Sequence, residues 1–276
     1  MADEWVRLKD WQDLILERLD GAGVARITLN RPERRNCWNR SMLDACFEAL
    51  EIVREDKELK AVITRGAGTS FSSGLDLAYL RTIQGEERDW DRPPRNFQLT
   101  EGIRQFPRIM IAQVHGYCLG GSLAFMNAHD LVIAAEDAQI GMPEMMRGSF
   151  GQLATSTLFH TQIPIKKAAL IQLTCRNLSG AEADRIGLVS MAVPAAELEA
   201  TTTDIAREIG SRHLAPLQSA KIAVQMGRDM PLPQAINIDR LVGVRQAQAI
   251  DPTANLQDYL HSQKGGTNVG YKRQDV

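Results

Sequence analysis

Two glycine-centred loops, each directly after an apolar run, constrain the fold of this chain most strongly. The first loop is Phe71-Ser72-Ser73-Gly74-Leu75-Asp76-Leu77, and the second is His115-Gly116-Tyr117-Cys118-Leu119-Gly120-Gly121-Ser122. A stretch with helical spacing follows each loop, so each is interpreted as a strand-to-helix turn. Strand and helix signals alternate from residue 60 to residue 135, which predicts stacked βαβ units and a mostly parallel sheet in an α/β fold.

The same two loops predict a site for an anionic oxygen. Glycines let the backbone approach a bound molecule closely, and a helix N-terminus adds free N–H groups and partial positive charge. Two N–H donors from two turns that converge on one carbonyl oxygen would stabilise an oxyanion. The segment Met142-Pro143-Glu144, further along the chain, places one carboxylate where it could face that site.

Composition excludes several other classes of protein. The formal net charge of −2 and the lack of a basic stripe argue against nucleic acid as the main partner. The four cysteines have neither CxxC nor Cys/His spacing, so no disulfide framework and no metal site are predicted. The acidic start lacks a signal core and no stretch is long enough to span a bilayer, so a cytoplasmic location without a membrane partner is predicted.

The remaining chain divides into a mixed part and a helical part. Strands are predicted at 13–19 and 24–30, joined by a glycine-rich hairpin, and a helix at 39–54. A polar loop is predicted at 84–95, a capping box at Ser179 opens a short helix, and a strand is predicted at 188–193. Helical spacing dominates at 195–211, 214–226 and 233–248, and a flexible tail is predicted from residue 265. We therefore predict a core at 1–194 and a helical segment at 195–276.

Several motifs, in order, resemble the crotonase or enoyl-CoA hydratase/isomerase superfamily. Besides the two glycine loops they are Leu29-Asn30-Arg31-Pro32-Glu33-Arg34-Arg35-Asn36, Asp130-Leu131-Val132-Ile133-Ala134-Ala135, Pro143-Glu144, Ala181-Glu182-Ala183 and Gly187-Leu188-Val189. The resemblance extends from about Leu14 to about Leu260. It implies a crotonase (ClpP-like) fold of repeated ββα units, with a C-terminal helical segment that forms a trimer or a dimer of trimers.

The resemblance also implies roles for individual residues. The backbone N–H groups of Leu75 and Gly121 match the family's oxyanion hole, and Glu144 matches a glutamate that moves protons at the acyl thioester. Burial of that carboxylate would raise its pKa toward the range of a general acid or base. Arg34 and Arg35 match basic residues near the CoA phosphates, and Cys37, Ser73 and Asp76 are further candidate CoA contacts. The implied partner is an acyl-CoA thioester, with no metal or redox cofactor.

One position departs from the family's two-glutamate hydratases. Aligning Gly120-Gly121 without a gap places Ala124 where those enzymes carry a second glutamate, and an alanine cannot hold water or transfer a proton. The chain therefore resembles the single-glutamate members. Gln152 lies where dienoyl-CoA isomerases carry an aspartate, but an amide is no general base.

Three functions remain open from the sequence. A single carboxylate suits a 1,3-proton shift, so double-bond isomerisation of an enoyl-CoA is expected. Hydration, or the hydratase/lyase reaction on a hydroxycinnamoyl-CoA, is the alternative, because a para-hydroxyl group can assist by delocalising charge. A catalytically weak CoA-binding subunit is the third. The acyl group cannot be read from the sequence.

Overall fold

The computed structural model describes residues 4–85, 93–161 and 163–250. Contacts divide the chain into two compact units, of which the first ends at Leu214 and the second begins at Ala215. The predicted tail from residue 265 and most of the predicted loop at 84–95 lie outside the described residues. Helix α2 (Leu77–Gly85) ends before that loop and α3 (Arg95–Arg104) begins after it.

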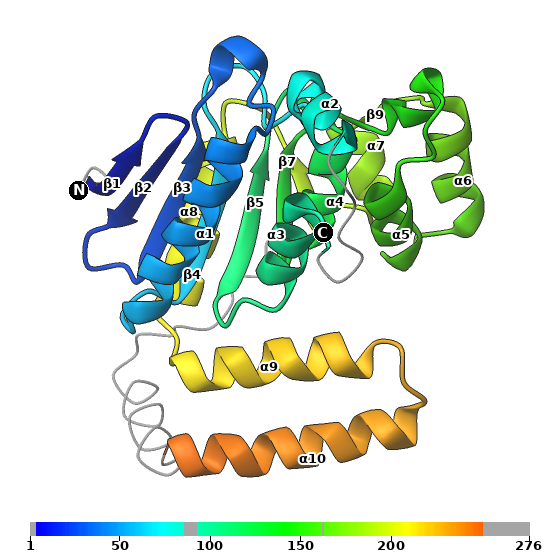
Figure 1. Cartoon of the computed structure of the whole chain (residues 1–276). Coiled ribbons are helices and arrows are strands. Elements are labelled where there is room, and N and C mark those ends of the chain that lie inside the picture. Colours follow the sequence, from blue (N-terminus) through cyan, green and yellow to red (C-terminus); the bar gives the residue numbers. More distant parts are fainter. Residues whose placement is uncertain (1–3, 86–92, 162, 251–276) are drawn as a thin grey trace. The chain divides into compact units, whose positions relative to one another are not determined.

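A seven-stranded sheet with the order β1-β2-β3-β4-β5-β7-β10 is the centre of the first unit (Figure 1). Its strands are β1 (Trp5–Trp11), β2 (Leu14–Leu19), β3 (Val24–Leu29), β4 (Ala61–Gly66), β5 (Ile109–Val114), β7 (Leu131–Ala135) and β10 (Met191–Val193). The first three strands pair antiparallel, and every pair from β3 to β10 is parallel. The prediction of a mostly parallel sheet is confirmed.

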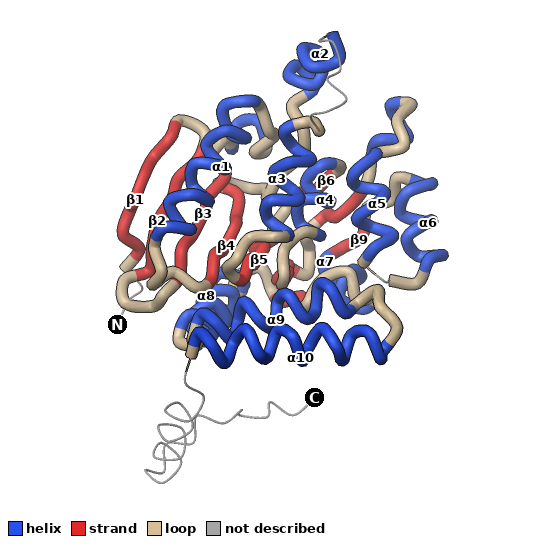
Figure 2. The backbone as a smooth tube through the Cα atoms, turned by 60° about the horizontal axis from the view of Figure 1, so that its bottom comes forward, coloured by secondary structure: helices blue, strands red, loops and turns tan. Residues whose placement is uncertain are grey.

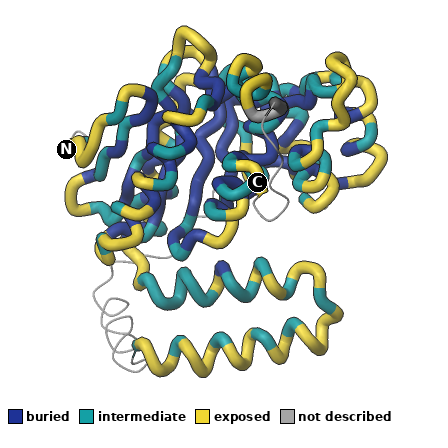
Figure 3. The backbone as a smooth tube through the Cα atoms, viewed as in Figure 1, coloured by how far each residue is buried: buried dark blue, intermediate teal, exposed yellow. Residues whose placement is uncertain are grey.

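Helices cover the two faces of the sheet and bury its centre, whereas most of β1 is exposed. Helix α1 (Arg40–Glu55) packs on β2 and β3, and α8 (Leu198–Gly210) packs on β3, β4, β5 and β7 from the opposite face. A strand covered on both faces favours an unbroken apolar run. Accordingly Ala61, Val62 and Ile63 of β4 are fully buried, and the centre of the sheet is the most buried part of the unit (Figure 3).

The predicted N-terminal boundary of α1 is confirmed by its cap. The Asn39 side chain accepts a hydrogen bond from the Met42 N–H at 2.8 Å, which satisfies one free donor of the first turn. The capping box at Ser179 is also present, with Glu182 as its partner, and opens α7 (Gly180–Arg185). The strand predicted at 188–193 is shorter in the structure, because β10 begins only at Met191 and residues 188–190 lie before it.

A second, three-stranded sheet stands beside the first and consists of β6 (Tyr117–Leu119), β8 (Gln139–Gly141) and β9 (Leu178–Ser179). Strand β6 pairs parallel with β8, and β9 antiparallel with β8. The remaining elements of the unit are α4 (Gly121–Asn127), α5 (Gln152–His160), α6 (Ile165–Thr174) and the 3₁₀ turns η1 (Pro32–Arg34) and η2 (Pro143–Arg147). The small sheet brings the second glycine loop next to the segment that contains Glu144.

The structure places the division between units later than the sequence analysis did. The predicted core ended at residue 194, but α8 lies beyond that residue and buries Leu198 and Ala206 in the core of the first unit. Helical spacing alone does not show whether a helix packs on a sheet or on another helix, which explains the difference. The second unit contains α9 (Leu214–Gly227) and α10 (Leu232–Ala249), which run side by side as an antiparallel pair (Figure 2).

Among the described residues, no helix is both long enough and apolar enough to cross a membrane.

Candidate active site

The first glycine turn is held by the backbone of Trp38. The Trp38 N–H donates to the Gly74 carbonyl at 2.8 Å, and the Asp76 N–H donates to the Trp38 carbonyl at 2.9 Å. These two bonds form a parallel bridge that leaves Leu75 between them. Gly74 has a φ of +87°, which favours glycine.

The second glycine turn lies directly against the first. The Leu119 N–H donates to the Ser72 carbonyl at 3.1 Å, and α4 begins at Gly121. A Cβ atom on Gly121 would lie 3.8 Å from the Leu75 nitrogen, and one on Gly74 would lie 3.1 Å from the Gly121 nitrogen. The two backbone amide groups that the sequence analysis named are therefore neighbours in space.

The amide groups of Leu75 and Gly121 also have no acceptor within the described part of the chain. Gly121 is the first residue of α4, and the first N–H groups of a helix have no intrahelical partner. Two neighbouring unpaired donors, one with the positive end of a helix dipole behind it, form a site that suits an anionic oxygen.

Glu144 lies on η2 and brings its carboxylate against the second glycine turn. A Cβ atom at Gly120 would lie 3.2 Å from the Glu144 Cδ and closer still to its Oε1. The Oε2 atom of Glu144 is buried and has no hydrogen-bond partner within the described residues. A buried acceptor without a partner is costly, and such groups are found where a structure awaits a ligand or a proton.

Burial raises the pKa of Glu144 above its ordinary value, and the opposing effects of a bond from its own backbone N–H and of the nearby Arg147 charge are smaller. A carboxylate whose pKa is raised is a stronger base than an ordinary carboxylate, and the carboxyl group that forms can return the proton. Glu144 therefore has the environment that proton transfer needs.

The five candidate CoA contacts lie around the first turn, in two different settings. Arg34 and Arg35 are exposed, and the Arg35 guanidinium lies 5.0 Å from the centre of the Tyr117 ring. The Ser73 N–H donates to the Arg35 carbonyl at 2.9 Å. Cys37 and Asp76 instead contact each other, with Cys37 Sγ 3.4 Å from Asp76 Oδ2. For all five residues, contact with a CoA group stays a prediction.

The polar side chains near the second glycine turn are engaged in hydrogen bonds of their own. Both ring nitrogens of His129 lie within 3.0 Å of oxygens, those of Phe125 and Thr64. The Ser122 hydroxyl donates to the Ser72 carbonyl at 2.8 Å. Ala124 is fully buried on α4, three residues after Gly121 and so on the same face of that helix.

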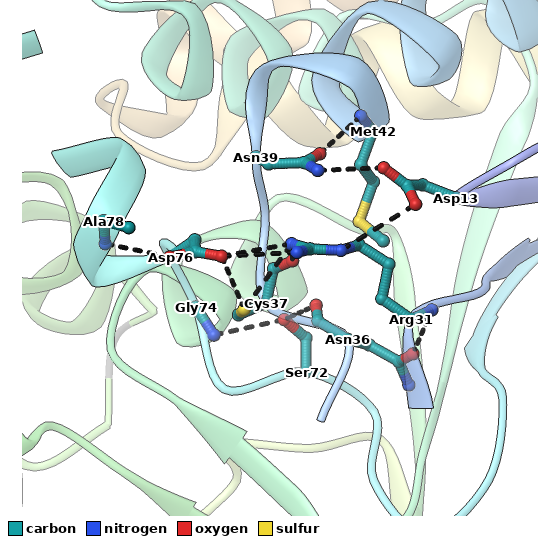
Figure 4. Close-up of polar contacts among 10 residues, drawn as sticks. All are labelled: Asp13, Arg31, Asn36, Cys37, Asn39, Met42, Ser72, Gly74, Asp76 and Ala78. Carbon is teal, nitrogen blue, oxygen red and sulfur yellow. Dashed lines mark hydrogen bonds and ion pairs between the residues drawn. The ribbon is translucent and has the colours of Figure 1, made fainter. Parts of the chain in front are cut away.

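Two residues that were not among the predicted site residues support the site. Trp38 is buried, brackets Leu75, and packs edge-on against Phe125 with ring centres 5.1 Å apart. The Arg31 Nη1 atom lies 3.3 Å from Asp76 Oδ2 (Figure 4). The available signal was their position in the segment after β3: Arg31 belongs to the motif Leu29 to Asn36, which was used only for the family resemblance, and Trp38 follows it by two residues.

The parallel-rich sheet, the small second sheet and the two adjoining glycine turns define the crotonase class of α/β proteins. The chain belongs to the enoyl-CoA hydratase/isomerase family, whose sequence profile matches residues 20–264. It is 30% identical over 218 residues to a probable mitochondrial enoyl-CoA hydratase of Dictyostelium discoideum, covering 79% of this chain and 77% of that protein.

Two further similarities agree with this assignment. A hydroxycinnamoyl-CoA hydratase-lyase of Pseudomonas fluorescens is 28% identical over 225 residues, which cover 80% of each chain. The crystal structure of an enoyl-CoA hydratase from Bacillus anthracis superposes with a TM-score of 0.82 at 26% identity, covering 91% of this chain and 97% of that one.

Proposed function

We propose that the protein transforms an enoyl-CoA thioester by stabilising an enolate. The N–H groups of Leu75 and Gly121 bind the thioester oxygen, and Glu144 removes and returns the proton. Negative charge that develops on the oxygen is met by two preformed donors, which is the most effective form of electrostatic catalysis. CoA enters as part of the substrate, and no metal or redox cofactor is proposed.

The observation that carries this proposal is the position of the Glu144 carboxylate beside Gly120. The turn that supplies one oxyanion donor also contacts the proposed base, so a carbonyl oxygen bound at the donors leaves the neighbouring acyl carbons within reach of Glu144. Its Oε2 has no hydrogen-bond partner in the described part of the chain, which supports the assignment, since that atom can then accept a proton.

Double-bond isomerisation is the reaction that one carboxylate supports best. Glu144 takes a proton from the α carbon of a 3-enoyl thioester, the electron pair moves to the thioester oxygen, and a dienolate forms. The same carboxyl group then returns the proton to the γ carbon, and the double bond ends between the α and β carbons. No second acid or base is required, which agrees with an alanine at position 124.

A hydratase/lyase reaction on a hydroxycinnamoyl-CoA is the second candidate. The similarity to the Pseudomonas fluorescens hydratase-lyase favours it. The substrate's para-hydroxyl group would delocalise charge and so replace part of the work of a second carboxylate. A catalytically weak CoA-binding subunit is the remaining alternative, and the buried carboxylate of Glu144 argues against it, because a binding protein gains nothing from that desolvation.

A homotrimer or a dimer of trimers in the cytoplasm completes the proposal. Helices α9 and α10 leave apolar side chains of Val224, Leu241 and Val244 uncovered by each other, which is a typical property of a surface that binds another subunit.

The test is turnover of a panel of acyl-CoA substrates by wild type and by Glu144→Gln. The panel contains 2-enoyl, 3-enoyl and hydroxycinnamoyl thioesters, with products identified by mass spectrometry. We expect the variant to lose about 10²- to 10⁴-fold in kcat, with acyl-CoA binding nearly unchanged. Glu136→Gln, at an exposed glutamate, is the matched control and should retain full activity. Turnover above a tenth of wild type would remove Glu144 from the mechanism.

A further inference from the structure

The Asp76 side chain connects the first glycine turn to a buried ion pair. Its Oδ2 accepts hydrogen bonds from Arg31 Nη1 and Nη2 at 3.3 and 3.4 Å, and from Cys37 Sγ at 3.4 Å (Figure 4). Its Oδ1 accepts from the Ala78 N–H at 2.9 Å, at the start of α2. Burial favours a higher pKa for Asp76, but these donors outweigh it and hold the pKa below its ordinary value. Asp76 is therefore an anion directly after Leu75.

Arg31 is itself fixed by groups outside the turn. Its Nη1 donates to the Cys37 carbonyl at 2.7 Å, and its backbone N–H donates to the Asn36 side chain at 2.9 Å. Its Nε lies 3.8 Å from Asp13 Oδ1, and Asp13 also accepts from the Asn39 side chain at 2.9 Å. Asn39 caps α1, so the guanidinium is tied to a rigid helix end.

Both neighbours of Leu75 are thus bonded, while its own N–H has no acceptor among the residues that the structure describes. The Gly74 carbonyl and the Asp76 N–H are paired with the backbone of Trp38, and the Asp76 carboxylate is paired with Arg31. A donor whose flanking residues are fixed keeps its direction without a partner of its own, and preorganised donors lose no energy to reorientation.

The charge of Arg31 has a second effect. A carboxylate directly after Leu75 would repel negative charge on an oxygen bound at that N–H, and the repulsion is strong where water is excluded. The guanidinium contacts the same carboxylate and cancels much of its field. Only 13% of the Arg31 side chain and 16% of the Asp76 side chain are exposed, so solvent screens the pair weakly.

We propose that Arg31 and Asp76 are positioning residues for the oxyanion donor Leu75: the pair fixes the direction of its N–H, and Arg31 neutralises a carboxylate that would otherwise oppose the oxyanion. This inference rests on the proposed function of Leu75. It adds Arg31, and it gives Asp76, already a candidate CoA contact, a role that needs no contact with the substrate.

The variants are Arg31→Met, Arg31→Met/Asp76→Asn and the control Glu17→Gln. Glu17 forms an ion pair of similar burial with Arg26 at 2.9 Å, on β2 and β3 and away from the glycine turns. We expect Arg31→Met to lower kcat by about 10- to 100-fold, because a slightly misplaced catalytic group costs that much, with KM changed by less than about threefold. Glu17→Gln should lower Tm without lowering kcat.

The double variant separates positioning from mere structural support. Removing the Asp76 charge in the Arg31→Met background should raise kcat by about fivefold or more over Arg31→Met alone, since the repulsion is then gone. A structural role alone predicts no such recovery. If Arg31→Met fails to fold, Arg31→Lys replaces it. Lysine keeps the positive charge but cannot contact the Asp76 carboxylate with two nitrogens, so this variant should lower kcat by about three- to tenfold.

Two measurements do not need turnover. Infrared spectra of bound butyryl-CoA with a ¹³C-labelled thioester carbonyl should show a lowered stretching frequency in wild type and a smaller shift in Arg31→Met. Hydrogen exchange of the Asp76 amide in the ligand-free protein should be about tenfold faster in Arg31→Met than in Glu17→Gln.

Unchanged Asp76 exchange, or a double variant no faster than Arg31→Met, would overturn the inference. A wild type that neither binds nor transforms any acyl-CoA would overturn the proposed function instead, and the exchange measurement would still decide whether the ion pair fixes the turn.

Discussion

The Glu144 carboxylate fills the space that a side chain at Gly120 would need. Gly120 has φ +60° and ψ −122°, a backbone conformation that other residues rarely adopt. Its N–H donates to the Gly141 carbonyl at 2.9 Å, which fixes the turn beside β8. The proposed base and the oxyanion turn are thus in direct contact, and a change at one should disturb the other.

Gly120→Ala should abolish most of the activity and lower stability by about 1 to 3 kcal/mol, since it combines a strained backbone with a collision against Glu144. The measurements are kcat on the best substrate of the panel and urea unfolding.

Gly187→Ala is its matched control. Gly187 also has a positive φ, of +77°, but nothing lies within 4 Å of a Cβ atom there. The Gly187→Ala variant should therefore lose stability through backbone strain alone and keep its activity. Equal activity losses in both variants would contradict the contact between Gly120 and Glu144 as the cause.

Glu144→Gln should be more stable than wild type at neutral pH. Burial raises the pKa of Glu144 above its unfolded value of about 4.3, so its contribution to stability is full below that value and is lost as pH rises through the folded pKa. The neutral amide avoids this loss, and we expect a gain of about 1 kcal/mol at pH 7.5 that shrinks toward pH 4. Urea unfolding at several pH values measures it. A variant less stable than wild type at pH 7.5 would show that Glu144 is not penalised by burial.

The same pKa shift predicts the pH dependence of turnover. Proton removal needs the ionised carboxylate, so kcat/KM should fall as pH drops through a pKa above the ordinary glutamate range. The pH dependence of kcat/KM in the control variant Glu136→Gln should match that of wild type. If kcat/KM instead falls only at a pH within or below the ordinary range of glutamate pKa values, another group is the base.

Ala124→Glu tests whether one carboxylate or two determine the reaction. If position 124 faces the site, a second carboxylate near Glu144 raises one pKa of the pair and lets a water be held between them, so crotonyl-CoA hydration should rise from a low baseline. Burying the new charge should lower the free energy of unfolding by about 2 kcal/mol or more.

Ala124→Gln is the control for size, because it fills the same space without a titratable group. The measurements are hydratase rate and Tm for each variant. A wild type that already hydrates crotonyl-CoA as fast as the glutamate variant would refute the single-glutamate interpretation.

Truncation separates the two units. A chain that ends after Leu214 keeps α8 on the sheet and should fold, with loss of the trimer. A chain that ends near Pro194 removes the buried Leu198 and Ala206 and should aggregate. Light scattering of the full chain and of both truncations is the measurement, and a monomeric full chain at micromolar concentration with full activity would contradict the proposed trimer.

Local patterns predicted the elements of the fold well. The hairpin before Val24, the helix at 39–54 and the Ser179 capping box depend on neighbouring residues, and all three are present, with the helix spanning Arg40–Glu55. The placement of α8 could not be predicted in the same way, because the residues that it covers on β4 and β5 are distant in the sequence.

The candidate site shows the same limit. The glycine loops predicted a site for an anionic oxygen, and the family resemblance assigned its donors to Leu75 and Gly121. The structure makes these two residues neighbours, although no pattern within one loop fixes its distance from another. Arg31 and Asp76 were not paired from the sequence, because an arginine after a strand and an aspartate in a turn are each typical of surface positions. Their pairing is a property of the tertiary structure.

The proposed site joins three segments of chain: the turn after β4, the turn before α4 and the segment after β8. The turns become neighbours only after β4 and β5 have paired in parallel across a long crossover, a non-local step that slows folding. No single turn or helix of the chain holds both donors and the carboxylate. During refolding, recovery of catalytic activity should therefore report the completion of the native topology, and it should lag behind the recovery of helical circular dichroism.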